Sequence, residues 1–163
     1  ASAFFSSVLR SKDMAFLMQF GAEAELLQES TNSTRQLQKA LGELRLSVPL
    51  GGLNPGPAPT ASNRAGTILY DAVFLAAEEL RKDVGRKAII IISDGVDTGS
   101  KTSRSKAIEA AHKSDAIVYS IYYADPMYQQ FGGGDGDLKR MSEDTGGRVF
   151  RVDRKTTLTD IFR

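Results

Sequence analysis

The chain contains no cysteine and no tryptophan, and it has a single histidine, His112. The absence of cysteine excludes disulfide bridges, thiolate nucleophiles and cysteine zinc sites. A single histidine excludes any site within this chain that needs two imidazole ligands. The groups that remain for chemistry are carboxylates, hydroxyls, lysines, arginines and the backbone.

The chain also lacks a strong excess of one charge and any long apolar run. Its 21 basic and 20 acidic residues give a net charge of +1 at pH 7. This balance argues against nucleic-acid binding, because nucleic-acid-binding domains usually carry a basic excess. No apolar run approaches the roughly 20 residues of a membrane-spanning helix, and the first residues show no signal-peptide pattern. We therefore expect no direct membrane insertion.

The composition that is present is typical of one folded domain. The chain has 163 residues, of which 41% are hydrophobic and 25% charged, and this is enough to bury a core without a metal or disulfide. We expect residues 1–163 to form a single domain. Residues 45–65 hold four of the five prolines and are predicted to form a long Pro/Gly-rich loop.

Short apolar runs alternate with helical patterns along most of the chain. The predicted strands are Met14–Phe20, a short edge strand Ala24–Leu27, a buried strand Ala88–Ile92, Ala116–Tyr122 and Arg148–Val152. The predicted helices begin at Ser33, Ile68, Ser103 and Thr157, with a short one around Leu138 and Met141. This alternation predicts a doubly wound α/β fold, with a mostly parallel sheet and helices on both faces.

Two polar residues are predicted at the carboxyl edge of this sheet, where ligands bind in such folds. Asp94 directly follows the strand Ala88–Ile92, and Thr67 lies at the start of the preceding helix. Taken singly, Thr67 is typical of a helix cap and Asp94-Gly95 of a turn. Together, a hydroxyl and a carboxylate are hard oxygen ligands suited to Mg²⁺ or Mn²⁺.

Five segments occur in a characteristic order: Leu9–Asp13, Ala65–Ala72, Arg86–Gly95, Ala116–Ile121 and Glu143–Arg148. This ordered set resembles the von Willebrand factor type A (VWA) domain, most closely its bacterial branch. The resemblance implies a Rossmann-like sheet with one antiparallel edge strand and a metal-ion-dependent adhesion site (MIDAS). Thr67 matches the threonine of that site and Asp94 its aspartate. In the family, a partner's acidic side chain completes the coordination of Mg²⁺.

One part of the family pattern is missing, because no Asp-x-Ser-x-Ser sequence occurs in the 163 residues. In the family this loop follows a central strand, upstream of a helix whose second half resembles Ala1–Arg10. We therefore expect an N-terminally incomplete domain that lacks its first strand, unless another chain supplies that strand. The consequences expected are weak or absent Mg²⁺ binding and self-association through the unpaired sheet position.

The resemblance implies a non-enzymatic adhesion module that binds an exposed Asp or Glu of a protein ligand, with loop 45–65 shaping the choice of partner. Two alternatives remain open: a metal-independent scaffold, and a metal-dependent phosphohydrolase-like enzyme that uses Asp94. The chain has no Gly-x-Ser-x-Gly, Walker or Gly-x-Gly-x-x-Gly motif. Bacterial relatives are often secreted or attached to the envelope, so an extracytoplasmic location is expected.

Other residues have simpler explanations. Asp71 is expected to favour the helix dipole rather than support the metal site, and Asp137 is expected to cap its helix. His112 is expected to be exposed to solvent. Tyr123 and Tyr128 are either packing residues or anchors for a partner.

Overall fold

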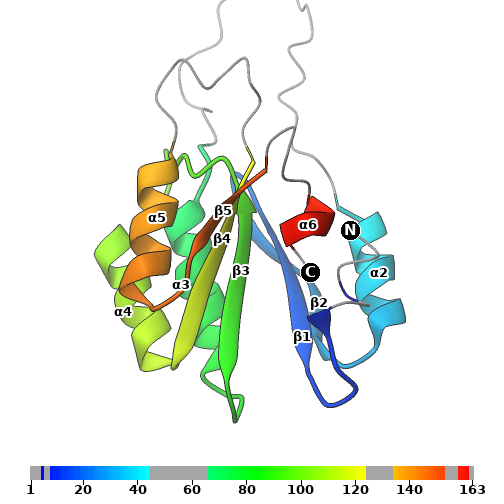
Figure 1. Ribbon diagram of the computed structural model, residues 1–163. Coiled ribbons are helices and arrows are strands. Elements are labelled where there is room, and N and C mark those ends of the chain that lie inside the picture. The colour runs from blue at the N-terminus through cyan, green and yellow to red at the C-terminus, as the bar shows by residue number, and fades with distance from the viewer. Residues whose placement is uncertain (1–4, 6–7, 45–65, 124–133, 153–157, 162–163) are drawn as a thin grey trace, which may run out of the picture.

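The computed structural model of the protein describes residues 5, 8–44, 66–123, 134–152 and 158–161 (Figure 1). Loop 45–65, Tyr128 and the expected cap Thr157 lie outside these residues. The order of elements is β1 (Ala15–Phe20), β2 (Ala24–Thr31), α2 (Thr34–Gly42), α3 (Leu69–Leu80), β3 (Lys87–Ser93), α4 (Arg104–Lys113), β4 (Ala116–Tyr122), α5 (Asp135–Asp144), β5 (Val149–Arg151) and α6 (Leu158–Ile161). The predicted alternation of strands and helices is confirmed, although β2 is longer than expected.

The described strands form two sheets rather than one. In the larger sheet β3, β4 and β5 are parallel, and Ile89 pairs with Val118. In the smaller sheet β1 and β2 form an antiparallel hairpin, in which Phe20 pairs with Ala24. The fold is therefore α/β and compatible with a Rossmann-like arrangement. The expectation of one doubly wound sheet is only partly met, because β1 and β3 are not hydrogen-bonded to each other.

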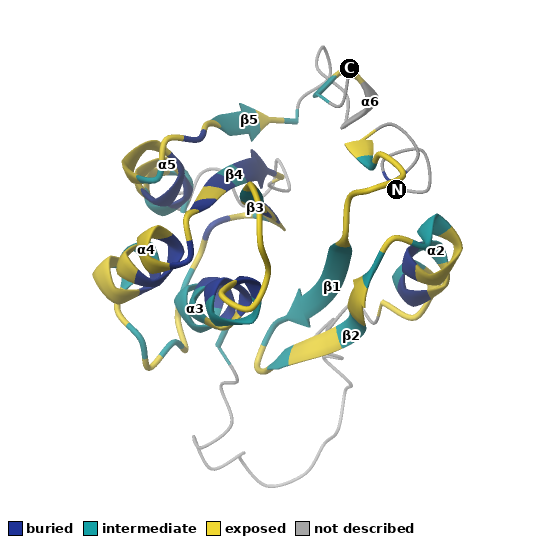
Figure 2. Cartoon of the chain, turned by 90° about the horizontal axis from the view of Figure 1, so that it is seen from below, coloured by how far each residue is buried: buried dark blue, intermediate teal, exposed yellow. Residues whose placement is uncertain are grey.

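Helices α3, α4 and α5 lie on the same side of the three-stranded sheet and form the core with it (Figure 2). Ile89 and Ile91 of β3 are buried against this layer, whereas Ile90 and Ile92 are 41% and 52% exposed. The prediction that Ala88–Ile92 is a buried strand therefore holds for one face of β3 and is wrong for the other. Successive side chains of a strand point to opposite faces of the sheet. The described helices cover only one of these faces, so alternate isoleucines of the run are buried and exposed.

Helix α2 lies against the hairpin instead and buries Leu37 and Ala40 there. Its predicted cap is confirmed, since the Ser33 side chain accepts a hydrogen bond from Gln36 N. The hairpin joins the main core through β1, because Phe16 and Phe20 pack against the cluster that contains α3. Helix α3 is therefore the element that connects the two sheets.

Leu69 and Leu75 on α3 provide a matched test of this packing. Leu69 is fully buried, while Leu75 is 45% exposed. We expect Leu69→Ala to lower the free energy of unfolding by about 2–5 kcal/mol, because it leaves a cavity under the helix. Leu75→Ala is expected to change it by roughly 0.5 kcal/mol or less. Urea unfolding followed by circular dichroism measures both, and equal losses would contradict this core.

Candidate functional site

The segment before α3 and the loop after β3 are bound together at the carboxyl edge of the sheet. The carbonyl oxygen of Thr67 accepts hydrogen bonds from Thr98 N at 3.0 Å and Gly99 N at 3.1 Å. Thr67 N donates to Thr98 Oγ1 at 3.1 Å. Gly66 permits this approach, since a Cβ placed there would lie 2.4 Å from Thr98 Oγ1. Thr67 is thereby brought to the loop that begins at Asp94.

The alternative explanation of Thr67 as the cap of helix α3 is wrong. The N-cap position is occupied by Ile68, which makes no side-chain cap bond. The free N–H groups of the first turn are satisfied from the β3–α4 loop: Tyr70 N donates to Asp97 Oδ1 at 3.2 Å and Asp71 N to Ser100 Oγ at 3.1 Å. The loop therefore caps α3 in place of a local residue.

Asp71 contributes to the same connection from the helix side. Its carboxylate accepts hydrogen bonds from Lys101 N at 2.9 Å and Thr102 N at 2.7 Å. Burial favours a higher pKa, but the hydrogen bonds from Thr102 and Lys101 and the charge of Lys101 together lower the pKa of Asp71. Asp71 therefore holds the loop as an anion, a role that an interaction with the helix dipole alone does not describe.

Asp94 differs from these carboxylates because it is exposed and, among the described residues, accepts hydrogen bonds only within its own turn. Its Oδ1 accepts Val96 N at 3.1 Å and lies 3.5 Å from Ser93 Oγ, both within its own turn. Within the described residues, Asp94 forms no ion pair. The Thr67 side chain likewise has no hydrogen-bond partner in the described part of the chain. These two oxygens are available to a ligand.

A second group of side chains joins α3, α4 and α5 beside this edge. Tyr70 Oη donates a hydrogen bond to Asp137, and Arg104 forms an ion pair with the same carboxylate. Desolvation, the hydrogen bond to Asp137 and the charges of Asp137 and Asp97 raise the pKa of Tyr70 to about 12. The predicted helix-capping role of Asp137 is wrong, because the N-cap of α5 is Gly134. Sequence reasoning missed Tyr70 and Arg104, which no local motif marks.

The close approach of two loops brings α5 to this edge. Gly95 has φ +77°, which favours glycine, and it lies against Gly134. A Cβ at Gly134 would lie 2.0 Å from the Gly95 carbonyl oxygen. Any larger residue at either position would therefore push α5 away from the turn that holds Asp94.

The donor set matches Mg²⁺ in type but is small. In the described ranges, no group of three or more His, Cys, Asp or Glu side chains is arranged to hold a metal ion. Mg²⁺ in proteins often uses one or two carboxylates and keeps several waters. Thr67 and Asp94 fit that pattern, but a site formed by these two alone leaves most coordination positions to water. Their assignment as metal ligands stays a prediction.

The remaining sequence candidates are placed as follows. His112 is exposed, as expected, and its Nε2 lies 2.7 Å from the carbonyl oxygen of Asp144. Tyr123 is 59% exposed just after β4, and its N donates to Ser93 O at 3.0 Å. Tyr123 therefore lies near Asp94 at the carboxyl edge, where a partner can reach it.

No protein-family model and no curated protein matches the sequence. The structure is similar to that of the conserved hypothetical protein BatB from Bacteroides thetaiotaomicron, with a TM-score of 0.62 and 19% identity over 93% of this chain and 76% of that one. The structure is also similar to that of an aerotolerance-related membrane protein from Bacteroides fragilis, solved with multiple mutations to serine. The TM-score is 0.63, and the sequence identity is 15% over 94% of this chain and 80% of that one. A membrane-spanning protein from Vibrio fischeri gives a TM-score of 0.39 and 20% identity over 99% and 77%.

The likeness to the two Bacteroides proteins shows a shared fold. At these identities it does not extend to activity or ligands. As for membrane insertion, none of the helices within the described ranges combines the length and the apolar character needed to cross a bilayer.

The role of Asp71 in holding the loop predicts a pH-dependent effect of Asp71→Asn. Because the pKa of Asp71 is lowered in the folded protein, its stabilising effect is complete above the unfolded pKa, about 4, and is lost as the pH falls through the folded pKa. We expect the variant to be less stable than the parent by about 1–2 kcal/mol at pH 7, and the difference to shrink below pH ~4.

Urea unfolding between pH 7 and pH 3 measures this difference. Asp83→Asn, at an exposed residue just after α3, is the matched control and should follow the parent at each pH. A difference for Asp71→Asn that stays constant across the range would contradict the proposed anionic role.

Proposed function

We propose that the chain is a VWA-like interaction module that captures an acidic group of a protein ligand through Mg²⁺ at the carboxyl edge of β3. The observation that carries the proposal is the connection between residues 66–68 and the loop after β3. This connection supports the proposal because it brings Thr67 to the loop that follows Asp94, and among the described residues neither side chain has a strong competing partner.

The chemistry follows from the charge of the proposed ligand set. Thr67 and Asp94 would hold the ion with one formal negative charge between them. Mg²⁺ bound there would supply a positive centre with exchangeable waters. A carboxylate from a partner is a suitable replacement for one of these waters, because it is a hard anionic oxygen ligand. Exposed Tyr123 offers an apolar contact beside it.

The surrounding carboxylates support binding rather than catalysis. Asp71 and Asp97 both accept backbone N–H groups and hold the loop in place. Asp137 is paired with Arg104 and Tyr70. Each of these groups therefore has a structural role, whereas acid–base catalysis would need a second group positioned to move a proton. We propose a non-enzymatic module for this reason.

A location in the cell envelope is part of the same proposal. The Bacteroides fragilis neighbour is described as a membrane protein. Together with the resemblance to bacterial VWA domains, this description supports a module that works beside a membrane and outside the cytoplasm.

Paramagnetic Mn²⁺ tests the metal site even when binding is weak. In a two-dimensional amide NMR spectrum, we expect small additions of Mn²⁺ to broaden the signals of residues 66–68 and 93–96 first. Asp94→Ala and Thr67→Ala should each abolish this selectivity. Asp135→Asn, at the carboxylate paired with Arg151, is the control and should leave it unchanged. Broadening centred elsewhere, or unaffected by Asp94→Ala, would show that the site is wrongly placed.

Carboxylate capture needs a separate measurement. A short peptide with one aspartate should bind more strongly in the presence of Mg²⁺ than without it, and its asparagine counterpart should not respond to the metal. Fluorescence anisotropy of labelled peptides measures this difference. Equal binding of both peptides, or no dependence on Mg²⁺, would favour the metal-independent scaffold instead.

A further inference from the structure

Basic residues gather at the end of the molecule opposite the candidate site. β3 and β4 begin at this end, because they are parallel and Lys87 pairs with Ala116. β1 also begins there, since it is followed by Gly21, whose carbonyl oxygen accepts a hydrogen bond from Ile68 N just before α3. β2 is antiparallel to β1 and therefore ends there. We give the name basic end to the connecting segments found here, residues 10–13, 32–35, 81–87 and 113–116.

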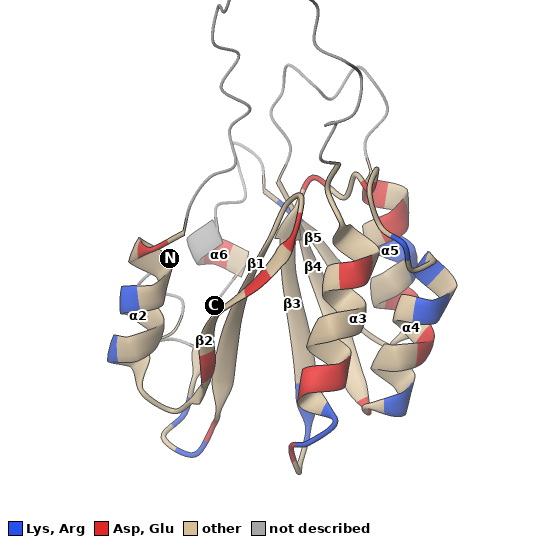
Figure 3. Ribbon diagram, turned by 180° about the vertical axis from the view of Figure 1, so that it is seen from behind, with Lys and Arg blue, Asp and Glu red and all other residues tan. Residues whose placement is uncertain are grey.

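The two ends of the molecule differ in charge. The basic end holds eight basic and three acidic residues. The described segments at the carboxyl edge hold seven acidic and three basic residues. These segments are residues 21–24, 42–44, 66–71, 93–104, 134–137 and 151–152. Figure 3 shows Lys and Arg on the turns at the lower end of both sheets, and Asp and Glu along the upper loops. The near-neutral net charge of the chain therefore conceals a separation of charge between its ends.

The turn between α3 and β3 is the most exposed part of the basic end. Val84 lies at its tip and is fully exposed, at 101%. Gly85 has φ +106°, which favours glycine, and a Cβ added there would meet no atom within 4 Å. Basic residues flank the tip on both sides: Arg81, Lys82, Arg86 and Lys87. The turn thus projects into solvent with an apolar side chain surrounded by cations.

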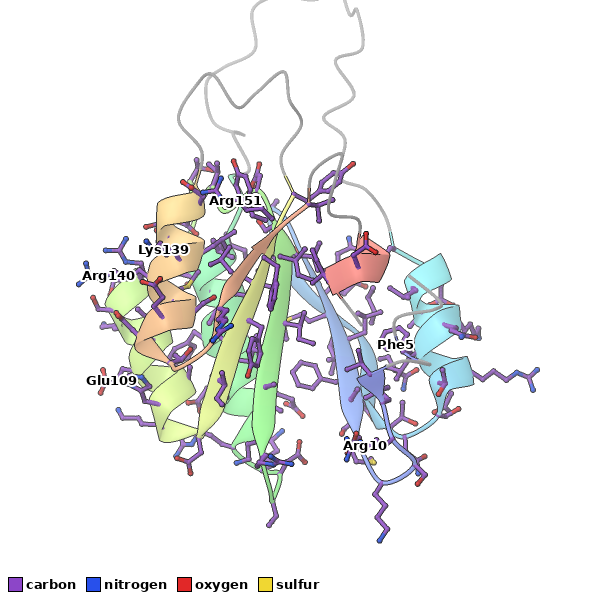
Figure 4. The ribbon with its side chains drawn as sticks, viewed as in Figure 1. Phe5, Arg10, Glu109, Lys139, Arg140 and Arg151 are labelled. Carbon is purple, nitrogen blue, oxygen red and sulfur yellow. The ribbon has the colours of Figure 1, made fainter. Side chains whose placement is uncertain are left out.

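Few of these cations are neutralised within the molecule. Arg81 and Lys82 pair with glutamates one turn earlier on α3, through exposed contacts of a kind that contributes little. In the part of the chain that the structure describes, Arg86, Lys87 and Arg10 form no ion pair. Figure 4 shows Arg10 near the end where β1 begins. Both sheets therefore contribute cations that are available to an external anion.

We propose that the basic end, with Val84 at its tip, binds the surface of an anionic lipid bilayer. Lys and Arg side chains close to such a surface are attracted by its anionic headgroups. An apolar side chain that enters the headgroup layer is removed from water, which adds to the binding. A nucleic acid would pair with the cations but leave Val84 in water. The presence of both features on one turn favours the bilayer, through a peripheral contact that needs no spanning helix.

This contact orients the molecule. The carboxyl edge has the opposite charge, so the same bilayer surface repels it. The turn that holds Asp94 therefore faces away from the lipid, toward a partner in solution. The inference shares the envelope location of the proposed function, but it uses neither Thr67 nor Asp94. It can therefore be tested, and can fail, separately from the metal site.

Co-sedimentation with vesicles tests the contact. EDTA is present, so that no divalent ion links the acidic edge to lipid. The protein should sediment with vesicles of phosphatidylcholine and phosphatidylglycerol, but not with phosphatidylcholine alone, and high salt should release it because salt screens the attraction. This response of the unmodified protein requires no variant.

Two double variants show whether the location of the charge matters. Arg86→Gln/Lys87→Gln should bind the phosphatidylglycerol vesicles at least about tenfold more weakly than the parent. Lys139→Gln/Arg140→Gln removes the same charge from α5, at residues that Figure 4 shows on the side of the molecule. This control should bind like the parent. Equal binding by the two double variants would overturn the proposal.

Tryptophan fluorescence tests Val84 itself, because the chain contains no tryptophan. The emission of Val84→Trp should shift to the blue when phosphatidylglycerol vesicles are added. Leu75→Trp, at a residue of α3 that is 45% exposed, is the control and should show no shift. A shift at Leu75→Trp but not at Val84→Trp would place the lipid contact elsewhere and overturn the proposal.

Two further outcomes would also overturn the proposal. The first is the absence of binding to phosphatidylglycerol vesicles, or equal binding to vesicles with and without this lipid. The second is binding of a single-stranded oligonucleotide without binding of vesicles, which would identify the basic end as a nucleic-acid surface. A failed Mn²⁺ experiment at Thr67 and Asp94 would leave the vesicle results unchanged.

Discussion

The hydrogen bonds between residues 66–68 and the loop after β3 are the constraint on which the rest of this structure depends. They fix where α3 begins and hold Thr67 against Thr98 and Gly99, and Ile68 N also binds the carbonyl oxygen of Gly21 at the end of β1. Because α3 packs on both sheets, the same contacts set the relation between the sheets. One connection therefore fixes both the start of α3 and the relation between the two sheets.

Two carboxylates hold the loop after β3 against α3, and each accepts more than one hydrogen bond. Asp97 caps the first turn of α3 and binds Ser100 within the loop. In the opposite direction, the Asp71 carboxylate on α3 accepts hydrogen bonds from Lys101 N and Thr102 N of the loop. Such reciprocal bonds satisfy polar groups that would otherwise be unpaired at a helix end. Asp94, which takes no part in this exchange, remains available at the surface.

The burial of β3 differs from the burial that its sequence pattern predicts. Its isoleucine run predicts burial on both faces, yet the described helices bury only Ile89 and Ile91. A continuous apolar run does not record which face of a strand is covered, whereas exposure depends on the elements that pack on each face.

Local sequence patterns determined the positions of the helices and strands. Ser33 caps its helix as predicted, and Ser103, where a helix was predicted to begin, caps that helix, because a cap bonds to groups two or three residues away. Asp94 directly after β3 also followed from the sequence, since the apolar run Ala88–Ile92 ends just before it.

Only the tertiary structure decided which polar groups are partners. Tyr70 and Arg104 both bind Asp137, across 67 and 33 residues of sequence, and Asp97 reaches Tyr70 across 27. No local periodicity encodes these pairs, because they depend on how α3, α4 and α5 pack on the sheet. The division of the strands into two sheets is decided in the same way, since backbone pairing requires a neighbour that local sequence does not specify.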